Sequence, residues 1–277
     1  MKIGVLGPLH LSDGNVACTP RAPKQRQVLA LLLMNANRTV SVDEFIEELW
    51  EYHPPSSAVQ TLQTYIMQLR KILSAEGGRS TDRAGRLVTR DSGYEFTAEP
   101  DELDIDVFAR LTATANQAVA KGEHATAAAL FAMALDLWRG PALANVRTGP
   151  VLRARLVGLV ESRLSALEQR IEADLKLGRH HALLSELSVL VERYPMHENL
   201  YAQFMLALYR SGRPAQALTV YGRLRRVLAD ELGLEPSPPM RRLHEAVLAA
   251  DPILDPPVPA TAGLSLDVAL QRSLPVA

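Results

Sequence analysis

The chain has 277 residues, 47% of them hydrophobic, and a formal net charge of −1. This length is typical of two domains, and the balanced charge does not by itself indicate a nucleic-acid or membrane partner. No apolar run reaches the length of a membrane span, no signal-peptide core follows Met1, and a single cysteine, Cys18, excludes an internal disulfide. We therefore expect a cytoplasmic protein.

The first 98 residues combine short strands with three helices. Alternating apolar residues predict strands over 2–6, 9–17 (with a turn at Asp13-Gly14), 86–90 and 94–97. Helical spacing of apolar residues predicts helices over 24–35, 42–50 and 57–73. Ser41 stands where an N-cap is expected for the second helix, and a glycine- and serine-rich loop spans 77–85. The order is strands, three helices and a hairpin.

The third predicted helix has the most informative pattern. Leu62, Ile66, Leu69 and Leu73 form one apolar stripe. The remaining faces carry amides, hydroxyls and cations without an acid, at Gln60, Thr61, Gln63, Thr64, Tyr65, Gln68, Arg70 and Lys71. Such groups bond base edges and phosphates in a DNA groove. Taken alone, the pattern also fits an ordinary amphipathic surface helix.

Charge is concentrated around this helix. Residues 57–90 have a net charge of +4, whereas residues 99–277 have a net charge of −2. The basic residues of the first segment are Arg70, Lys71, Arg79, Arg83, Arg86 and Arg90. A local basic patch on a nearly neutral chain fits a surface that faces phosphates, with a chance cluster as the alternative.

The third helix followed by Leu87-Val88-Thr89-Arg90-Asp91-Ser92-Gly93-Tyr94-Glu95-Phe96 resembles the winged helix-turn-helix domain of OmpR-type response regulators. The resemblance implies that this helix enters the major groove and that the hairpin, or wing, touches the minor groove. It assigns DNA contacts to Thr61, Gln63, Thr64, Tyr65, Gln68, Arg70, Lys71 and Arg90. For Arg90, a solvated hairpin charge is the alternative. In that family a receiver domain precedes the effector domain, whereas this sequence starts directly with the effector strands, so we do not expect control by phosphorylation of an N-terminal aspartate.

One departure from that family pattern concerns Met67 and Gln68. Family members often carry arginines on the groove face at this point of the helix, whereas this chain has a thioether and an amide. Glutamine bonds adenine through two hydrogen bonds, while arginine prefers guanine. The hypothesis from the sequence is that Gln68 reads an adenine or makes a water-bridged contact, and that the affinity of each monomer for DNA is modest.

The rest of the chain is predicted to be helical. An acidic junction precedes it, where Asp104 is predicted to cap the first helix. Helices are predicted over 105–121, 124–138, 150–177, 180–194, 198–211, 214–231 and 238–249. Gly178-Arg179 and Gly212-Arg213 lie 34 residues apart, which is the tetratricopeptide period. A bundle without repeats is the alternative.

Four stretches make the resemblance narrower: residues 137–143 (LWRGPAL), 194–200 (YPMHENL), 207–213 (ALYRSGR) and 228–238 (LADELGLEPSP). They resemble the bacterial transcriptional activation domain. Joined directly to an OmpR-type domain, this is the arrangement of the Streptomyces antibiotic regulatory protein family. The resemblance implies a pathway-specific activator of secondary-metabolite genes that self-associates on direct repeats near the −35 region of double-stranded DNA. It also implies recruitment of the RNA polymerase holoenzyme, including its sigma factor.

The predicted fold is mainly α with a small β component: a winged helix-turn-helix at 1–98 and an all-α, tetratricopeptide-like domain at 104–250. Residues 251–277 form a proline-bearing tail, with a short helix over 264–274 or disorder. No phosphate-binding loop is present, and His180, His181 and His197 lack the spacing of a metal site. We expect no enzyme, metal or cofactor. A repressor of the same fold and a helical protein-interaction scaffold remain alternatives.

Overall fold

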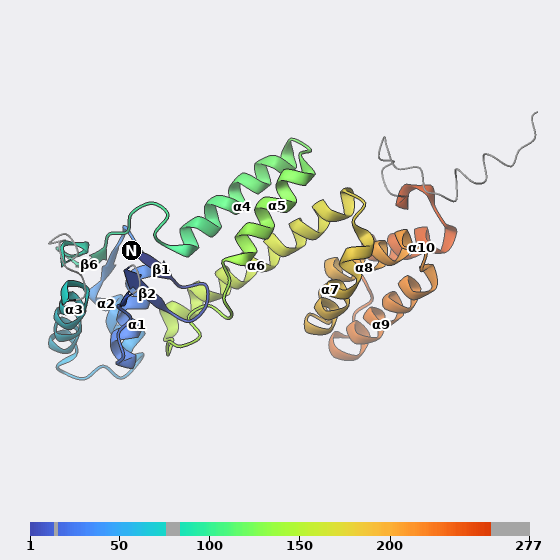
Figure 1. The fold of residues 1–277 in the computed structure, drawn as a ribbon. Helices are drawn as coiled ribbons and strands as arrows, with labels where there is room; N and C mark the ends of the chain where they lie inside the picture. Colours follow the sequence, from blue (N-terminus) through green and yellow to red (C-terminus); the bar gives the residue numbers. More distant parts are fainter. Residues whose placement is uncertain (14–15, 76–83, 256–277) are drawn as a thin grey trace, which may run out of the picture. The chain divides into compact units, whose positions relative to one another are not determined.

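The computed structural model describes residues 1–13, 16–75 and 84–255, which form two compact units, Met1–Arg170 and Ile171 onward (Figure 1). The boundary between the units falls within one long helix. Arg79, Arg83, most of the predicted loop 77–85 and the predicted tail helix 264–274 lie outside the described residues. The predicted fold class, mainly α with a small β component, is confirmed.

The first unit begins with a small antiparallel sheet in the order β1-β2-β3. Its strands are β1 (Lys2–Gly4), β2 (His10–Asp13) and β3 (Val16–Ala17). Ile3 lies opposite Leu11, and both side chains are buried together with Val5, Leu6 and Leu9. Alternation along these short strands therefore gives the sheet one apolar face.

Three helices follow: α1 (Pro23–Leu33), α2 (Val42–Trp50) and α3 (Ala58–Ala75). The predicted cap of α2 is confirmed as a capping box. Ser41 Oγ accepts from the Glu44 amide at 3.2 Å, and the Glu44 carboxylate accepts from the Ser41 amide at 2.9 Å. The box satisfies two amide groups that a helix start otherwise leaves unbonded.

The wing is a sheet of three strands rather than the hairpin of two that the sequence indicated. β5 (Leu87–Arg90) and β6 (Gly93–Phe96) pair as predicted after a 3₁₀ turn, η1 (Ala84–Arg86), and β4 (Thr39–Ser41) pairs with the other edge of β6. A strand of three residues just before a helix has no periodic signal of its own. Phe45 of α2 meets Tyr94 of β6 edge to face, with ring centroids 6.0 Å apart.

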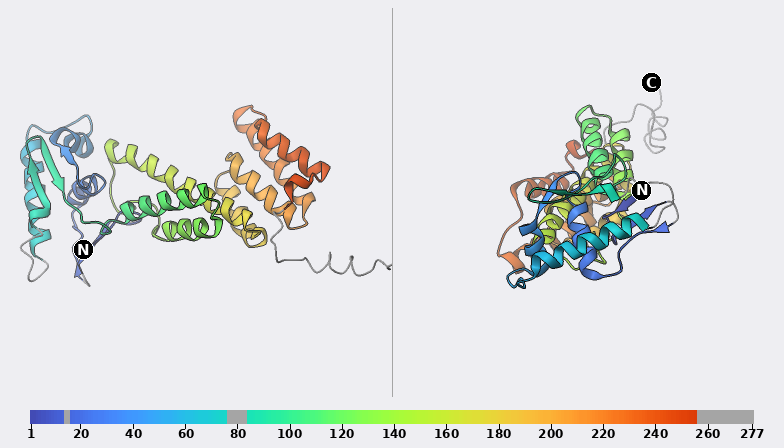
Figure 2. Two further views of the ribbon diagram at one scale, coloured as in Figure 1. Left: turned by 90° about the horizontal axis from the view of Figure 1, so that it is seen from above. Right: turned by 90° about the vertical axis from the view of Figure 1, so that its left-hand side faces the viewer.

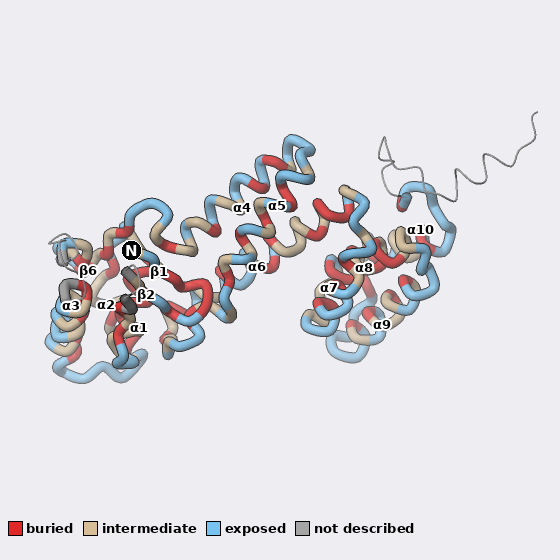
Figure 3. The backbone as a smooth tube through the Cα atoms, viewed as in Figure 1, coloured by how far each residue is buried: buried red, intermediate tan, exposed pale blue. Residues whose placement is uncertain are grey.

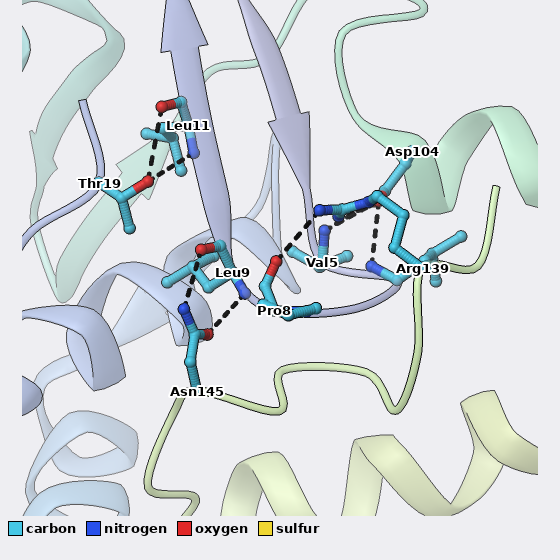
Figure 4. A network of polar contacts seen from close by, with 9 residues as sticks. Val5, Pro8, Leu9, Leu11, Thr19, Asp104, Arg139 and Asn145 are labelled. Carbon is cyan, nitrogen blue, oxygen red and sulfur yellow. Dashed lines mark hydrogen bonds and ion pairs between the residues drawn. The ribbon is translucent and has the colours of Figure 1, made fainter. Parts of the chain in front are cut away.

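Helices α4 (Asp104–Ala120) and α5 (His124–Asp136) form an antiparallel pair in the same unit, and α6 (Pro150–Lys176) begins in it. Asp104 does not cap α4 as predicted. Its carboxylate accepts from the Val5 and Leu6 amides at 2.8–3.0 Å and pairs with Arg139 at 3.1 Å (Figure 4). The carboxylate therefore bonds amides that lie about a hundred residues earlier in the sequence instead of capping its own helix.

Two further contacts join the loop before α6 to the winged helix. Asn145 bonds both backbone groups of Leu9, accepting from its amide at 2.6 Å and donating to its carbonyl at 3.2 Å (Figure 4). Glu48 of α2 is 1% exposed and accepts from the Gly149 and Leu152 amides at 2.5 and 2.9 Å. The Glu48 carboxylate thus caps the start of α6 from another helix.

The second unit, from Ile171 onward, contains α7 (His180–Arg193), α8 (Glu198–Arg210), α9 (Pro214–Leu232), α10 (Pro238–Ala249) and the 3₁₀ turn η2 (Pro252–Leu254). Successive helices pack on one another, with Tyr201 fully buried between them. Nowhere in the described ranges is a helix both long and apolar enough to span a membrane.

The 34-residue spacing marks two equivalent corners. Gly178 and Gly212 adopt left-handed φ values of 73° and 71°. In each case the next amide reaches back to the carbonyl five residues earlier, from Arg179 to Asp174 and from Arg213 to Leu208. This is the Schellman geometry that ends a helix at glycine, so the period in the sequence repeats as a period in the structure.

We predict that Glu48→Ala lowers the free energy of unfolding of the first unit by about 3 kcal/mol, because it leaves buried amides without an acceptor. Urea unfolding followed by tryptophan fluorescence reports this unit alone, since Trp50 and Trp138 are the chain's two tryptophans. Glu47→Ala, an exposed acid on the same helix, is the control and should change stability by less than about 0.5 kcal/mol. Equal effects of the two changes would contradict the capping role.

Candidate nucleic-acid interface

Helix α3 lies at the end of the first unit that is farthest from α4 and α5 (Figure 2). Its buried side chains are Ala58, Leu62, Ile66, Leu69 and Leu73, which are at most 5% exposed. They pack against α1 and α2 at the spacing that the sequence predicted. The apolar stripe therefore fixes which face of α3 is turned outward.

The outward face carries one row of exposed side chains, here called the outer row: Gln60, Thr64, Met67 and Lys71. In Figure 3, the tube of α3 carries pale blue, exposed stretches. At 100° per residue, this row lies opposite the buried stripe. It contains no acid. Thr64 Oγ1 donates to the Gln60 carbonyl at 2.9 Å, so its oxygen lone pairs remain directed outward as acceptors.

The structure places the predicted contact residues in two groups. Four are exposed: Gln63, Thr64, Lys71 and Arg90. Four are partly buried on the flanks of α3: Thr61, Tyr65, Gln68 and Arg70. The exposed group offers an amide, a hydroxyl and two cations, the chemistry that bonds phosphates and base edges.

Arg70 braces the wing. Its Nε donates to the Leu87 carbonyl at 3.0 Å, and its Nη2 donates to Thr89 Oγ1 at 2.8 Å. These contacts tie α3 to β5, and they favour a positioning role over the phosphate contact suggested by the sequence. A guanidinium can reach two acceptors on one strand because its donors form a planar fork.

Gln68 is also held by a neighbouring element. Its Oε1 accepts from Gln25 Nε2 of α1 at 2.6 Å. Bidentate recognition of adenine needs both the carbonyl and the amino group of a glutamine pointing at one base. The contact to Gln25 turns the Gln68 oxygen toward α1, so the hypothesis that Gln68 reads adenine requires that this bond break.

At the tip of the wing, Arg90 forms a two-point ion pair with Glu95 across the hairpin. Nε donates to Oε2 at 2.8 Å, and Nη2 donates to Oε1 at 3.2 Å. The hydrogen bond from Arg90 lowers the pKa of Glu95 below its ordinary value, so both groups are charged at neutral pH. The Arg90 side chain remains 48% exposed at the surface of the wing.

Two outer-row residues were not among the predicted contacts. Gln60 belongs to the acid-free face noted in the sequence, and Met67 appeared there only as the absence of an arginine. The signal that identifies both is their spacing. Residues 60, 64, 67 and 71 follow the helical period, half a turn away from the apolar stripe.

Comparisons with known proteins match both parts of the chain. Residues 17–96 match the family described as transcriptional regulatory protein, C terminal. Residues 103–248 match the bacterial transcriptional activator domain. The regulatory protein DnrI of Streptomyces peucetius is 46% identical over 271 residues, covering 96% of this chain and all of that protein.

A second relative is the regulatory protein AfsR of Streptomyces coelicolor, 41% identical over 256 residues that cover 92% of this chain but 25% of AfsR. Among solved structures, that of Mycobacterium tuberculosis EmbR in complex with a low affinity phosphopeptide superposes with a TM-score of 0.84 at 33% identity. The match covers 98% of this chain and 69% of the EmbR chain.

We predict that two adjacent cations of α3 have different roles: Arg70 stabilises the first unit, and Lys71 contacts DNA. Arg70→Ala should lower the free energy of unfolding of the first unit by about 1–2 kcal/mol, since the Leu87 carbonyl and Thr89 lose their donor. Lys71→Ala should change stability by less than about 0.5 kcal/mol, but should reduce the slope of log affinity for duplex DNA against log salt by about 0.9. Urea unfolding and anisotropy titrations at several salt concentrations measure the two effects. If Lys71→Ala left the slope unchanged, the outer row would not face phosphates.

Proposed function

This chain belongs to the Streptomyces antibiotic regulatory protein family of transcriptional regulators, and from that premise we propose how it acts. The outer row of α3 enters the major groove of promoter DNA, and the tip of the wing lies at the adjacent minor groove. Protomers bind head to tail on direct repeats near the −35 region. The all-α domain predicted at residues 104–250 then contacts RNA polymerase holoenzyme, including its sigma factor, and the chain activates a secondary-metabolite gene cluster.

The observation that carries this proposal is the acid-free, exposed outer row on a helix whose other side is fully anchored. A helix that reads a groove must present polar side chains at a fixed angle, which requires that its own position be rigid. The buried stripe and the Arg70 brace supply that support. The wing follows in the same unit and carries an exposed arginine at its tip.

Contacts within the first unit join the winged helix to α4 and to the start of α6, which supports the proposal that DNA docking orients these two helix starts. Asp104, Asn145 and Glu48 each bond backbone amides across this joint. Backbone groups cannot swing away as side chains do, so the start of α6 keeps its angle to α2. Extra contact with polymerase worth about 1.4 kcal/mol raises occupancy of an unsaturated promoter about tenfold.

We predict that the Arg90–Glu95 ion pair limits the affinity of the wing for DNA. Arg90→Ala should weaken binding by about tenfold, because minor-groove potential favours an arginine. Glu95→Gln should strengthen binding by about threefold, because it removes a negative charge beside the phosphates and releases Arg90. Gel shifts at fixed salt give both affinities. A weaker complex for Glu95→Gln would show that the pair works on DNA as a unit.

The test of the whole proposal is run-off transcription with purified polymerase holoenzyme. Footprinting on the promoters beside this gene supplies the template, and the footprint should cover direct repeats next to the −35 region. Transcript should increase when the chain is added, and the Lys71→Ala variant should need more protein for the same increase. Falling transcript at full promoter occupancy would indicate the repressor, and the absence of any salt-sensitive DNA binding would indicate the protein-interaction scaffold.

A further inference from the structure

We propose that Met67 recognises the 5-methyl group of a thymine in each half-site, and so acts as a specificity-determining residue of the chain. This inference rests on the proposed function, because it assumes that the outer row enters the major groove. It shifts base recognition from Gln68, which the sequence favoured, to Met67, which the sequence marked only as the absence of an arginine.

The position of Met67 is the first argument. Its side chain is 62% exposed and stands in the outer row between Thr64 and Lys71. Lone exposed apolar residues are common on protein surfaces and need no explanation by themselves. Met67, however, occupies the middle of the row that points directly away from the core, with polar neighbours on both sides. A helix that docks into a groove along this row brings Met67 to the base edges.

Two polar side chains on the flanks of α3, close to Met67 in sequence, are bonded to other elements. Gln68 is bonded to Gln25, and Arg70 is bonded to one carbonyl and one hydroxyl of β5. These two side chains serve packing between elements on the flanks of α3. Base contact in the middle of the helix is therefore left to Met67, with Gln63 and Thr64 as its exposed polar neighbours.

The chemistry of the groove identifies the occupant. The thymine methyl is the apolar group that base edges present in the major groove, and side chains that read it do so by apolar contact. Methionine suits this role because it is unbranched, flexible and polarisable, and adapts to the shape of what it covers. Burying one methyl group corresponds to an affinity change of about fourfold.

The experiment removes the methyl group and nothing else. A duplex selected by the chain from random double-stranded DNA serves as the probe, and each thymine of one half-site is replaced in turn by deoxyuridine, which keeps the same pairing and hydrogen-bonding edge. For the unaltered chain, one replacement should weaken binding about fourfold. For Met67→Ala, the thymine and deoxyuridine probes should bind equally, at the weaker level.

Matched controls separate this effect from general damage. Met133→Ala removes a methionine that is 56% exposed on α5, and it should keep the full difference between thymine and deoxyuridine. Met67→Leu keeps an apolar side chain and should keep part of the affinity difference between the thymine and deoxyuridine probes. Tryptophan fluorescence and urea unfolding check that Met67→Ala is folded, as expected for a surface residue.

The possible outcomes are distinct. If binding is tight and salt-sensitive but no single replacement of thymine by deoxyuridine weakens it, the role of Met67 is overturned while the proposed function stands. A methyl effect that persists in Met67→Ala and disappears in Val59→Ala would assign the contact to Val59, the other exposed apolar residue near the start of α3, and would equally overturn it. A chain that selects no duplex at all would contradict the proposed function itself.

Discussion

The buried carboxylate of Glu48 is the contact on which the arrangement of the first unit depends. It lies 1% exposed on α2 and accepts from the amides of Gly149 and Leu152 at the start of α6, and from Gln27 Nε2 at 2.9 Å. A helix start is a favourable place for a negative charge, since its amides are unbonded and its dipole is positive there. The carboxylate is thus satisfied without water. An acid of the helix-turn-helix fixes the start of a helix that lies a hundred residues later.

Gly149 shows how closely the two segments meet at this joint. A Cβ at this position would lie 2.1 Å from the Glu48 carbonyl oxygen, so any larger residue would push α6 away from α2. On another side of the same unit, Arg139 and Asn145 bond the loop around Pro8 and Leu9. These joints account for a first compact unit that runs to Arg170, past residue 98, where the sequence predicted the end of the DNA-binding domain. The boundaries 1–98, 104–250 and 251–277 stay predictions about domains.

The sequence predicted what depends on local spacing and missed what depends on distant partners. The bounds of α2 and α10 agree with the predictions to the residue, because a cap or a proline marks their starts. The roles of Asp104, Gln68 and Arg70 were not foreseen, since their partners at Val5, Gln25 and Leu87 become neighbours only after folding. Glu48 did leave a signal: an acid at the spacing of the apolar residues Phe45 and Leu49 falls on the buried side of its helix, which requires a partner.

The same partners set the strength of the proposed DNA contact. Around α3 and the wing, within the residues that the structure describes, Arg70 is bonded to β5 and Arg90 to Glu95, whereas Lys71 extends into solvent. The chain as a whole carries a net charge of −1, so its net charge adds no overall attraction to DNA beyond that of the local basic patch. If the proposed function holds, few neutralised phosphates would give weak nonspecific binding. A single protomer would then occupy a half-site only briefly, and lasting occupancy would require a second contact on the same DNA, from a neighbour on the next repeat or from polymerase, because linked weak contacts add to a strong one. The ion pair at Arg90 and the brace at Arg70 would in this way make DNA occupancy depend on the partners of the proposed complex.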